Sequence, residues 1–528
     1  MATALVCDAT RSAFPREQTV SLRLLEVGYD VADRTLLDTV NVTLAPGEKV
    51  AISGDNGSGK TTLLRLASGL LDPCHGRVHC DGARALLAQL DSDAPGPEAT
   101  LLAAVRSEHP EPRPGVFDKA LRGAGLDPFA PPWALSGGER QRARLALLLA
   151  LPVELLCLDE PTNHLDTDGM DWLQARLRAS PAAMLLVDHD RTFLSSIANR
   201  TGFLAQGSLD VYPGGYQQAC DARDADRAAQ RRRHEAQVSR QRALREAADR
   251  ERARARSAGH FDHRRADGQA SILVKGKAES ASRTHARASA AMRVRLARET
   301  PEAKPFEDRR RVRFSAGSFE PGPQEVLVAS DIDVERGGRR LVSDLTLYLR
   351  RGERLALTGP NGSGKTTLLE VLAGRRPPNS GTVRHGSGLR LLDVAQADWA
   401  PSRCAASRSG HATVGALLRA ERPALNDSEV WETTAAVGVA SPPERVLTEL
   451  SGGERQRLEV ARLSVTSAQW LVLDEPTLHL DVRAIEALET LLAEYPGTLL
   501  FVSHDRALVA RIASRRLALD GEGGWTLD

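Results

Sequence analysis

Two nearly identical stretches decide the fold of this 528-residue chain: GDNGSGKTTLL at Gly54–Leu64 and GPNGSGKTTLL at Gly359–Leu369. Three further stretches occur twice in the same order: LSGGERQR, LDEPT, and a tetrapeptide that reads DHDR and then SHDR. The copies are 305 residues apart at the glycine-rich stretch and 315 residues apart at the others. Such a long repeat indicates a duplicated domain, because solenoid units are roughly 20–50 residues long. The later stretches begin at Leu135 and Leu450, Leu158 and Leu473, and Asp188 and Ser503.

Each copy places short apolar runs directly before polar motifs. This pattern predicts an α/β fold with a mostly parallel sheet that binds ligands at the carboxyl ends of its strands. We place the two domains at about residues 21–216 and 326–528, after an N-terminal extension (1–20) and on either side of a linker (217–325). The predicted strands are Lys49–Ser53, Leu155–Leu158 and Met184–Val187 in the first copy and Arg354–Thr358, Leu471–Leu473 and Leu499–Val502 in the second.

The glycine-rich stretches have the G-x-x-x-x-G-K-T pattern of Walker A loops, whose backbone N–H groups cradle phosphates at the start of a helix. Lys60 and Lys365 are expected to reach the β- and γ-phosphates of ATP, and Thr61 and Thr366 to ligate Mg²⁺. The predicted ATP-binding residues are Gly54, Asn56, Gly57, Ser58, Gly59, Lys60, Thr61 and Thr62 in the first copy, and Gly359, Asn361, Gly362, Ser363, Gly364, Lys365, Thr366 and Thr367 in the second.

An acidic pair ends one apolar run in each copy. Asp159 and Asp474 stand where a Walker B aspartate holds Mg²⁺, and Glu160 and Glu475 follow them. A glutamate placed there can act as general base toward water, and such positioned proton transfer contributes roughly 10²–10⁴-fold. An acidic pair that only solvates a strand end is the alternative, which the upstream Walker A loops disfavour.

The stretch LSGGERQR resembles the signature of ATP-binding-cassette (ABC) ATPases. In that family two cassettes meet head to tail, so each ATP lies between one Walker A loop and the other cassette's signature. The resemblance implies two shared sites and a monomer that sandwiches its own cassettes. Site one joins Gly54–Thr62, Asp159 and Glu160 to Ser451, Gly452 and Gly453, and site two joins Gly359–Thr367, Asp474 and Glu475 to Ser136, Gly137 and Gly138.

The same resemblance implies further roles in each copy. Gln89 and Gln396 match glutamines that ligate the metal, and His189 and His504 match catalytic switch histidines that contact the γ-phosphate. The remaining matches are the D-loop aspartates Asp166 and Asp481.

Two departures predict unequal sites. Tyr29 lies 25 residues before Gly54, where the family places an aromatic ring against adenine, but the same offset before Gly359 gives Val334. The first copy also reads EPTNHLD where the second reads EPTLHLD.

The linker is basic in a chain whose net charge is only +1: residues 217–300 hold 21 Lys and Arg against 11 Asp and Glu. Residues 217–257 contain no proline or glycine and predict one long helix, with a thin seam at Ala229, Ala236 and Ala243 for a partner helix. Lys277–Arg298 is predicted to be that partner. The predicted tip between them offers Phe261, His263, Arg264, Arg265, Ile272, Leu273, Val274 and Lys275.

Tandem cassettes, the EPTNHLD stretch and this linker resemble the ABC-F class, whose members bind ribosomes. The resemblance implies that the linker contacts 23S rRNA and the P-site tRNA in the cytoplasm. No inserted arm fits between Gln89 and Ser136, and the chain ends 24 residues after His504. Two cassettes with a long linker and no inserted arm most resemble the antibiotic-resistance branch of this class. Members of that branch protect the ribosome's peptidyl-transferase centre or exit tunnel from antibiotics.

Three alternatives stay open. A linker of this charge can be a solvated coiled-coil spacer, and the whole protein can be a housekeeping ABC-F translation factor or the ATPase subunit of a drug transporter with a separate membrane partner. The sequence shows no secretion signal and no apolar run long enough to span a bilayer. Six scattered cysteines without a CxxC pair argue against a zinc site and against a disulfide framework.

Overall fold

The computed structural model describes residues 21–31, 34–87, 100–103, 112–163, 165–258, 269–298, 319–394, 412–439, 441–478 and 480–528. It divides into two compact units, one from Met1–Ala219 with Arg309–Asp528 and the other from Cys220–Asp308. The first unit holds both cassettes and the second holds most of the linker.

The first cassette is built on a six-stranded sheet in the order β5-β6-β7-β3-β8-β9. All neighbours in it are parallel except β8 and β9, as the apolar runs predicted. A second, antiparallel sheet in the order β2-β1-β4 packs its apolar side chains against β3 and the helix α1. The strands are β1 (Leu22–Val31), β2 (Arg34–Leu44), β3 (Lys49–Gly54), β4 (His75–Cys80), β5 (Arg84–Leu87), β6 (Leu155–Asp159), β7 (Ala183–Val187), β8 (Arg200–Ala205) and β9 (Ser208–Pro213).

The second cassette repeats this plan with sheets in the orders β14-β15-β16-β12-β17-β18 and β11-β10-β13. The predicted strands of both copies are confirmed to within one residue at either end. The strands are β10 (Glu325–Arg336), β11 (Arg339–Arg350), β12 (Arg354–Thr358), β13 (Ser380–His385), β14 (Leu391–Val394), β15 (Trp470–Asp474), β16 (Thr498–Val502), β17 (Arg515–Leu519) and β18 (Trp525–Leu527).

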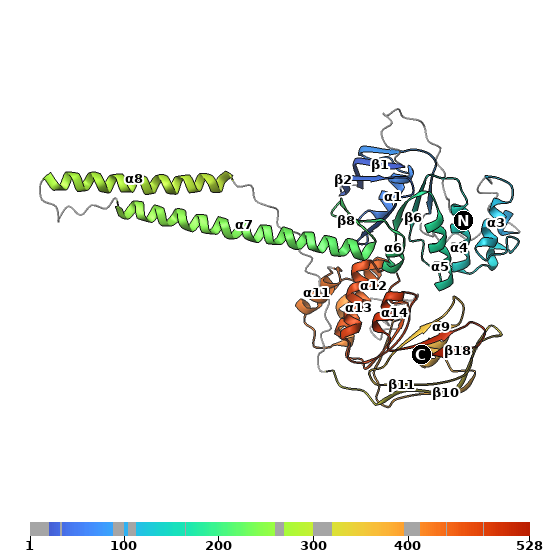
Figure 1. Ribbon diagram of the computed structural model, residues 1–528. Helices are drawn as coiled ribbons and strands as arrows, with labels where there is room; N and C mark the ends of the chain where they lie inside the picture. Colours follow the sequence, from blue (N-terminus) through green and yellow to red (C-terminus); the bar gives the residue numbers. More distant parts are fainter. Residues whose placement is uncertain are drawn as a thin grey trace. The chain divides into compact units, whose positions relative to one another are not determined.

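Helices flank these sheets in both cassettes (Figure 1). Those of the first cassette are α1 (Lys60–Ser68), α3 (Val116–Gly123), α4 (Gly137–Leu149), α5 (Thr167–Ala179) and α6 (Arg191–Ile197). Those of the second are α9 (Lys365–Leu372), α10 (Val414–Glu421), α11 (Asp427–Ala436), α12 (Gly452–Val465), α13 (Val482–Glu494) and α14 (Arg506–Ile512). The predicted α/β fold with two tandem cassettes is confirmed. The exact domain limits stay a prediction, and residues Phe319 and Glu320 of the predicted linker already contact the second cassette.

The linker forms two long helices, α7 (Tyr216–Ala258) and α8 (Gln269–Arg298). The first matches the prediction, but the second begins eight residues before Lys277. Ile272–Lys275 therefore lie inside α8 and not in a turn, which corrects the predicted tip. Gly276 directly precedes the predicted start at Lys277, yet an interior glycine costs only about 1 kcal/mol relative to alanine, which a 30-residue helix tolerates.

The seam of the hairpin is also not where the alanine repeat placed it, because Ala236 and Ala243 are exposed. Ala248, Glu251 and Ala255 face α8 instead: Ser289 Oγ donates to the Ala248 carbonyl at 2.9 Å, and Ser282 Oγ donates to the Ala255 carbonyl at 2.8 Å. Between these contacts His285 Nδ1 lies 2.6 Å from Glu251 Oε2. The α7 residues that face α8 are spaced three and four residues apart, and one of them is charged. A search for apolar residues that repeat every seven positions therefore could not find this antiparallel seam.

Candidate functional site

Both Walker A loops join a buried strand to a helix, β3 to α1 and β12 to α9. Gly59 and Gly364 precede the helices at φ angles of 101° and 96°, a left-handed conformation that glycine adopts without strain. Lys60 Nζ donates to two loop carbonyls at 2.8 and 3.0 Å, and Lys365 Nζ does the same at 3.0 and 2.9 Å. Burial lowers the pKa of both lysines, so an anion such as a phosphate would stabilise their charged form.

The residues predicted to hold Mg²⁺ fit that ion. Thr366 Oγ1 and Asp474 Oδ1 meet at 3.3 Å, a hydroxyl beside a carboxylate, which are ligands that Mg²⁺ accepts. Asp159 is 3% exposed, and its Oδ2 has no hydrogen-bond partner among the described residues. Burial raises the pKa of both aspartates, and a bound cation would offset that penalty. A hydrogen bond from Thr61 opposes the shift at Asp159, which places this hydroxyl beside the same carboxylate.

Both predicted bases adopt the same strained backbone conformation. Glu160 and Glu475 each have a φ of 48°, and a non-glycine residue held there costs about 1–3 kcal/mol. Their amides donate to the adjacent strand, Glu160 to the Val187 carbonyl at 2.8 Å and Glu475 to the Val502 carbonyl at 3.0 Å. The turn therefore fixes each carboxylate at the carboxyl edge of its sheet.

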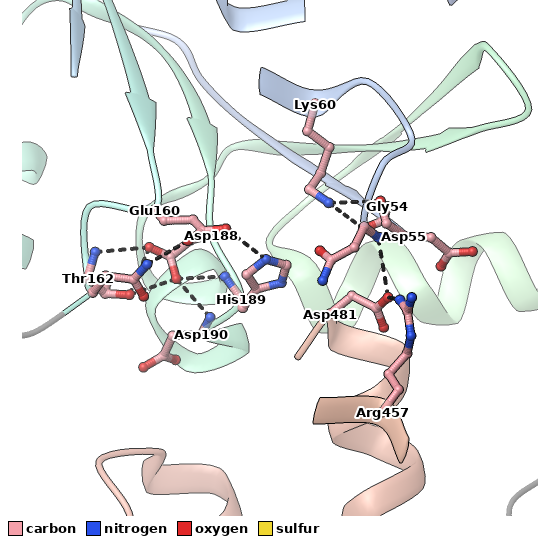
Figure 2. Close-up of polar contacts among 12 residues, drawn as sticks. Gly54, Asp55, Lys60, Glu160, Thr162, Asp188, His189, Asp190, Arg457 and Asp481 are labelled. Carbon is pink, nitrogen blue, oxygen red and sulfur yellow. Dashed lines mark hydrogen bonds and ion pairs between the residues drawn. The ribbon is translucent and has the colours of Figure 1, made fainter. Parts of the chain in front are cut away.

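In the first cassette two side chains, Asn163 and His189, hold the glutamate, and Figure 2 shows the contact with His189. Asn163 Nδ2 donates to Glu160 Oε2 at 2.5 Å, and His189 Nε2 lies 3.2 Å from Glu160 Oε1. Burial raises the pKa of Glu160, but the contacts with His189 and Asn163 outweigh it and bring the pKa below its usual value. Glu160 is thus ionised and oriented, as a general base requires.

A buried aspartate, Asp188, fixes the segments that carry Asn163 and His189. It accepts hydrogen bonds from Thr162 Oγ1 and the His189 amide, both at 2.7 Å, and from the Asp190 amide at 2.8 Å (Figure 2). Burial raises its pKa. The repeated DHDR/SHDR stretch was the sequence signal for this residue, and its replacement by Ser503 in the second cassette is a further difference between the sites.

In the second cassette the base has fewer partners. Leu478 stands in place of Asn163 and offers no hydrogen bond. Glu475 accepts from the His504 amide at 3.2 Å, and its other oxygen lies 3.4 Å from His504 Nε2. Burial raises the pKa of Glu475 to about 7 and lowers that of His504 to about 4. Burial therefore works against charge on both groups of this pair.

The signature stretches begin helices α4 and α12 with reciprocal caps. The Glu139 amide donates to Ser136 Oγ at 3.2 Å, and the Ser136 amide donates back to Glu139 Oε2 at 2.8 Å. Ser451 and Glu454 repeat this capping box. The caps leave the amides of the signature glycines at a helix N-terminus, where an anion is favoured.

Site two is brought together by the structure. A cavity of about 620 Å³ is lined from the first cassette by Ser136, Gly137 and Gly138, and also by the catalytic groups Glu160 and His189 with Asn163. From the second cassette it is lined by Glu475, by His504 and by the Walker A residues Asn361, Gly362, Gly364, Lys365, Thr366 and Thr367. Asn361 N also donates to Asp166 Oδ2 at 3.3 Å, a contact from the Walker A loop to the opposite D-loop.

Site one shows the same head-to-tail contacts. Asn56 N donates to Asp481 Oδ2 at 3.3 Å, and Arg457 lies 3.6 Å from the same oxygen (Figure 2). A side chain at Gly453 would approach Asn56 Nδ2 to 3.6 Å, so the second signature adjoins the first Walker A loop.

Ion pairs also join the cassettes, among them Arg483 with Asp55 at 3.4 Å. Arg191 of α6 pairs with Glu489 of α13, which is 1% exposed and also binds Arg511 at 2.9 Å. Arg506 of α14 pairs with Asp171 of α5 at 2.9 Å, with both side chains more than a third exposed.

Several residues predicted for the ATP sites or the linker tip are not described by the structure or do not face the sites. Gln89, Gln396, Phe261, His263, Arg264 and Arg265 lie outside the described residues. Of the adenine positions, Tyr29 is half-buried against the first core, while Val334 is fully buried and cannot face a ligand. Within the described ranges, no helix is both long and apolar enough to cross a membrane.

Comparison with known proteins agrees with this geometry. Residues 37–163 and 342–478, half of the chain, match the family described as ABC transporter. The tylosin resistance ATP-binding protein TlrC of Streptomyces fradiae is 33% identical over 95% of this chain and 97% of its own length. The energy-dependent translational throttle protein EttA of Mycobacterium tuberculosis is 30% identical over 93% and 89%, respectively. The ATP-binding protein Uup of Caulobacter vibrioides is 32% identical over 95% and 78%.

Solved structures show the same fold. The archaeal ribosome recycling factor aABCE1, in a complex with a ribosomal stalk protein, has a TM-score of 0.61 at 18% identity and covers 95% of this chain and 89% of its own. At that identity the likeness concerns the fold alone.

Proposed function

From its membership of the ABC transporter family, as an ATPase with two ATP-binding domains, we propose that this chain is an ABC-F protein that binds the ribosome. In its ATP-bound state it binds the ribosome in the cytoplasm and protects the peptidyl-transferase centre or exit tunnel from antibiotics. Hydrolysis then releases it. The observation that carries the proposal is the likeness to a tylosin resistance protein over 97% of that protein's length, together with the paired sites.

The proposed cycle closes the two cassettes on ATP binding and opens them on hydrolysis. ATP joins the Walker A loop of one cassette to the signature of the other, so binding closes the sandwich around both nucleotides. Mg²⁺, when bound, neutralises charge on the β- and γ-phosphates. Glu160 and Glu475 then orient water and accept its proton, and His189 and His504 hold these carboxylates in place. Loss of the γ-phosphate breaks the link between cassettes and lets them part.

The linker is proposed to be the ribosome-contacting element. Its described helices carry exposed arginines such as Arg242, Arg250 and Arg252. Surplus positive charge suits contact with a phosphate backbone, and such contacts weaken as salt rises. The residues proposed to reach 23S rRNA and the P-site tRNA are those between α7 and α8, with the first turns of α8.

The first experiment is sedimentation with 70S ribosomes. The Glu160→Gln/Glu475→Gln chain should pellet with ribosomes when ATP is present, because it binds ATP and cannot hydrolyse it. The Lys60→Ala/Lys365→Ala chain is the control that should stay in the supernatant. If the glutamine variant stays there too, the proposal is wrong, and pelleting with membranes would support a transporter subunit instead.

A second experiment tests protection itself. Translation of a reporter in vitro, inhibited by tylosin as a first probe drug, should be restored by the wild-type chain. A chain without residues 259–268 should still bind ribosomes and fail to restore translation.

The EttA-like relative favours one rival, a translation factor without a drug. That function would change translation equally with and without tylosin, whereas drug protection would change it only with tylosin.

A further inference from the structure

The two Walker A loops differ at their second residue, which is Asp55 in site one and Pro360 in site two. Asp55 is half-buried, and its charge acts on Lys60 of the same loop. Burial lowers the pKa of Lys60, and Asp55 is one of four carboxylates that oppose this shift. A carboxylate that close to a phosphate-binding lysine repels a triphosphate unless a cation neutralises it.

An arginine of the opposite cassette meets this carboxylate. Arg483 Nε lies 3.4 Å from Asp55 Oδ1, and Arg483 Nη1 donates to Asp55 Oδ2 at 3.4 Å. The two side chains are 31% and 32% exposed, so solvent screens the pair only in part. Arg483 is the second residue of α13 and follows the D-loop residue Asp481, which accepts from the Asn56 amide at 3.3 Å. Two neighbouring residues of one Walker A loop therefore contact the start of α13.

Site two has the same backbone frame without this ion pair. The Asn361 amide donates to Asp166 at the same distance of 3.3 Å. Asp166 and Asp481 also cap α5 and α13 alike, each accepting from a helix amide at 2.9 Å. The second residue of α5 is the exposed Asp168, and the equivalent Walker A residue is Pro360. Proline carries no charge, so these two positions cannot form the pair.

We propose that Arg483 is a positioning residue of site one, where it neutralises Asp55 from the opposite cassette and favours ATP in the closed sandwich. Site two binds ATP without an equivalent residue. The inference rests on the proposed nucleotide sites and on the proposed closing of the cassettes around ATP.

The physical reason lies in where the two charges belong. Asp55 is part of the loop that is expected to hold phosphates, so an open cassette presents an unfavourable charge to ATP. The pair with Arg483 spans the two cassettes and forms only when they are closed. An interaction made in one state alone shifts the equilibrium toward that state. ATP affinity is therefore tied to closure more strongly at site one than at site two.

Equilibrium dialysis of labelled ATP against the full-length chain tests one site at a time. In the Lys365→Ala chain, which leaves site one, Arg483→Ala should raise the dissociation constant about two- to fivefold, the scale of a partly exposed ion pair. The same change should have almost no effect once Asp55→Ala is present, because the charge that Arg483 neutralises is gone. An equal effect with and without Asp55 would overturn the proposal, since Arg483 would then act only on its own helix.

Two further variants keep this result from being a loss of folding. Arg483→Gln retains most of the side chain without its charge and should raise the dissociation constant by the same factor. Asp168→Ala is the matched control, because it removes a charge from the same position of α5, which belongs to site two. It should leave ATP binding at site one unchanged, and a rise as large as that of Arg483→Ala would contradict the proposal.

The effect of Arg483→Ala should fall on the dissociation constant more than on the single-turnover rate at saturating ATP. Glu160 and the side chains that hold it are not altered, so the water keeps its proton acceptor. A fall in the saturated rate with no change in the dissociation constant would overturn the proposed role.

Transplanting the pair tests it in the other direction. In the Lys60→Ala chain, which leaves site two, Pro360→Asp should weaken ATP binding. Adding Asp168→Arg should then tighten it about two- to fivefold, because the two D-loops contact their Walker A loops at the same distance. No tightening would show that another feature of site one, and not this ion pair, links ATP affinity to closure.

These outcomes are separable from failure of the proposed function. If the Lys365→Ala and Lys60→Ala chains bind no ATP, the nucleotide sites themselves are wrong and the inference falls with them. If both chains bind ATP and Arg483→Ala changes nothing, only the inference about Arg483 fails.

Discussion

Site one and site two share every repeated motif, yet they differ in how they hold the catalytic glutamate. Glu160 has an amide donor on one oxygen and an imidazole on the other, whereas the Glu475 carboxylate meets His504 alone among the residues that the structure describes. The first arrangement holds the pKa of Glu160 below its usual value, whereas burial raises the pKa of Glu475 to about 7. The comparison teaches that the partners of the base differ between the sites: His189 and, after it, Asn163 favour the ionised form of Glu160, and Leu478 removes the second of these contacts from site two. We therefore expect site one to hydrolyse faster.

The largest expected effect comes from removing each base in turn. Glu160→Gln should lower hydrolysis at site one by roughly 10²–10⁴-fold, because the water loses its proton acceptor. Glu475→Gln should remove only the smaller contribution of site two from the total rate. Single-turnover hydrolysis of labelled ATP checks both. If the two variants lose equal shares of the rate, the sites are equivalent and the comparison fails.

The next effect concerns the ion pairs between the cassettes. Glu489→Gln should destabilise the paired cassettes by about 3 kcal/mol, because Arg191 loses a buried partner. Asp171→Asn, the exposed counterpart, should cost no more than about 1 kcal/mol. Melting temperatures from calorimetry compare the two. An equal fall in melting temperature for both variants would show that the buried ion pair stabilises the protein no more than the exposed one.

Exchanging the residue beside each base sharpens the comparison directly. A hydrogen bond to a charged group is worth about 1.5–3 kcal/mol, so Asn163→Leu should slow site one by roughly tenfold or more. Leu478→Asn should speed site two, because an amide would favour the ionised form of Glu475. Each is measured as single-turnover hydrolysis with the opposite glutamate changed to glutamine. If neither variant changes the hydrolysis rate of its site, this hydrogen bond does not determine the rate.

The smallest effect lies at the D-loops. Burial raises the pKa of Asp166, but hydrogen bonds from the Gly169 and Asn361 amides outweigh it, so the pKa lies below its usual value. A carboxylate with a depressed pKa adds stability above the unfolded-state pKa of about 3.9 and loses it as pH falls through the folded value. Asp166→Asn should therefore lower the melting temperature at pH 7, and the difference should shrink as the pH falls below the unfolded-state pKa. A difference that stays constant as the pH falls would contradict this assignment.

The sequence predicted the strands, the Walker A loops and the signature stretches because each depends on local chemistry. Gly59 permits a left-handed turn, Ser136 and Glu139 make a cap three residues apart, and an apolar run such as Leu155–Leu158 is buried on both faces wherever it is placed. In the linker the same reasoning predicted α7 to within one residue at either end, but it started α8 eight residues late and placed the seam at the wrong alanines.

The sequence alone determined that the chain is a duplicated α/β ATPase, since motifs read in register need no knowledge of distant contacts. It also showed that Asn163 and Leu478 differ. Only the tertiary structure decided what that difference does, because the amide reaches Glu160 through a turn whose geometry depends on the neighbouring strand. It also decided which ion pair is buried, since Arg191 and Glu489 stand about 300 residues apart in the chain and meet across the cassettes.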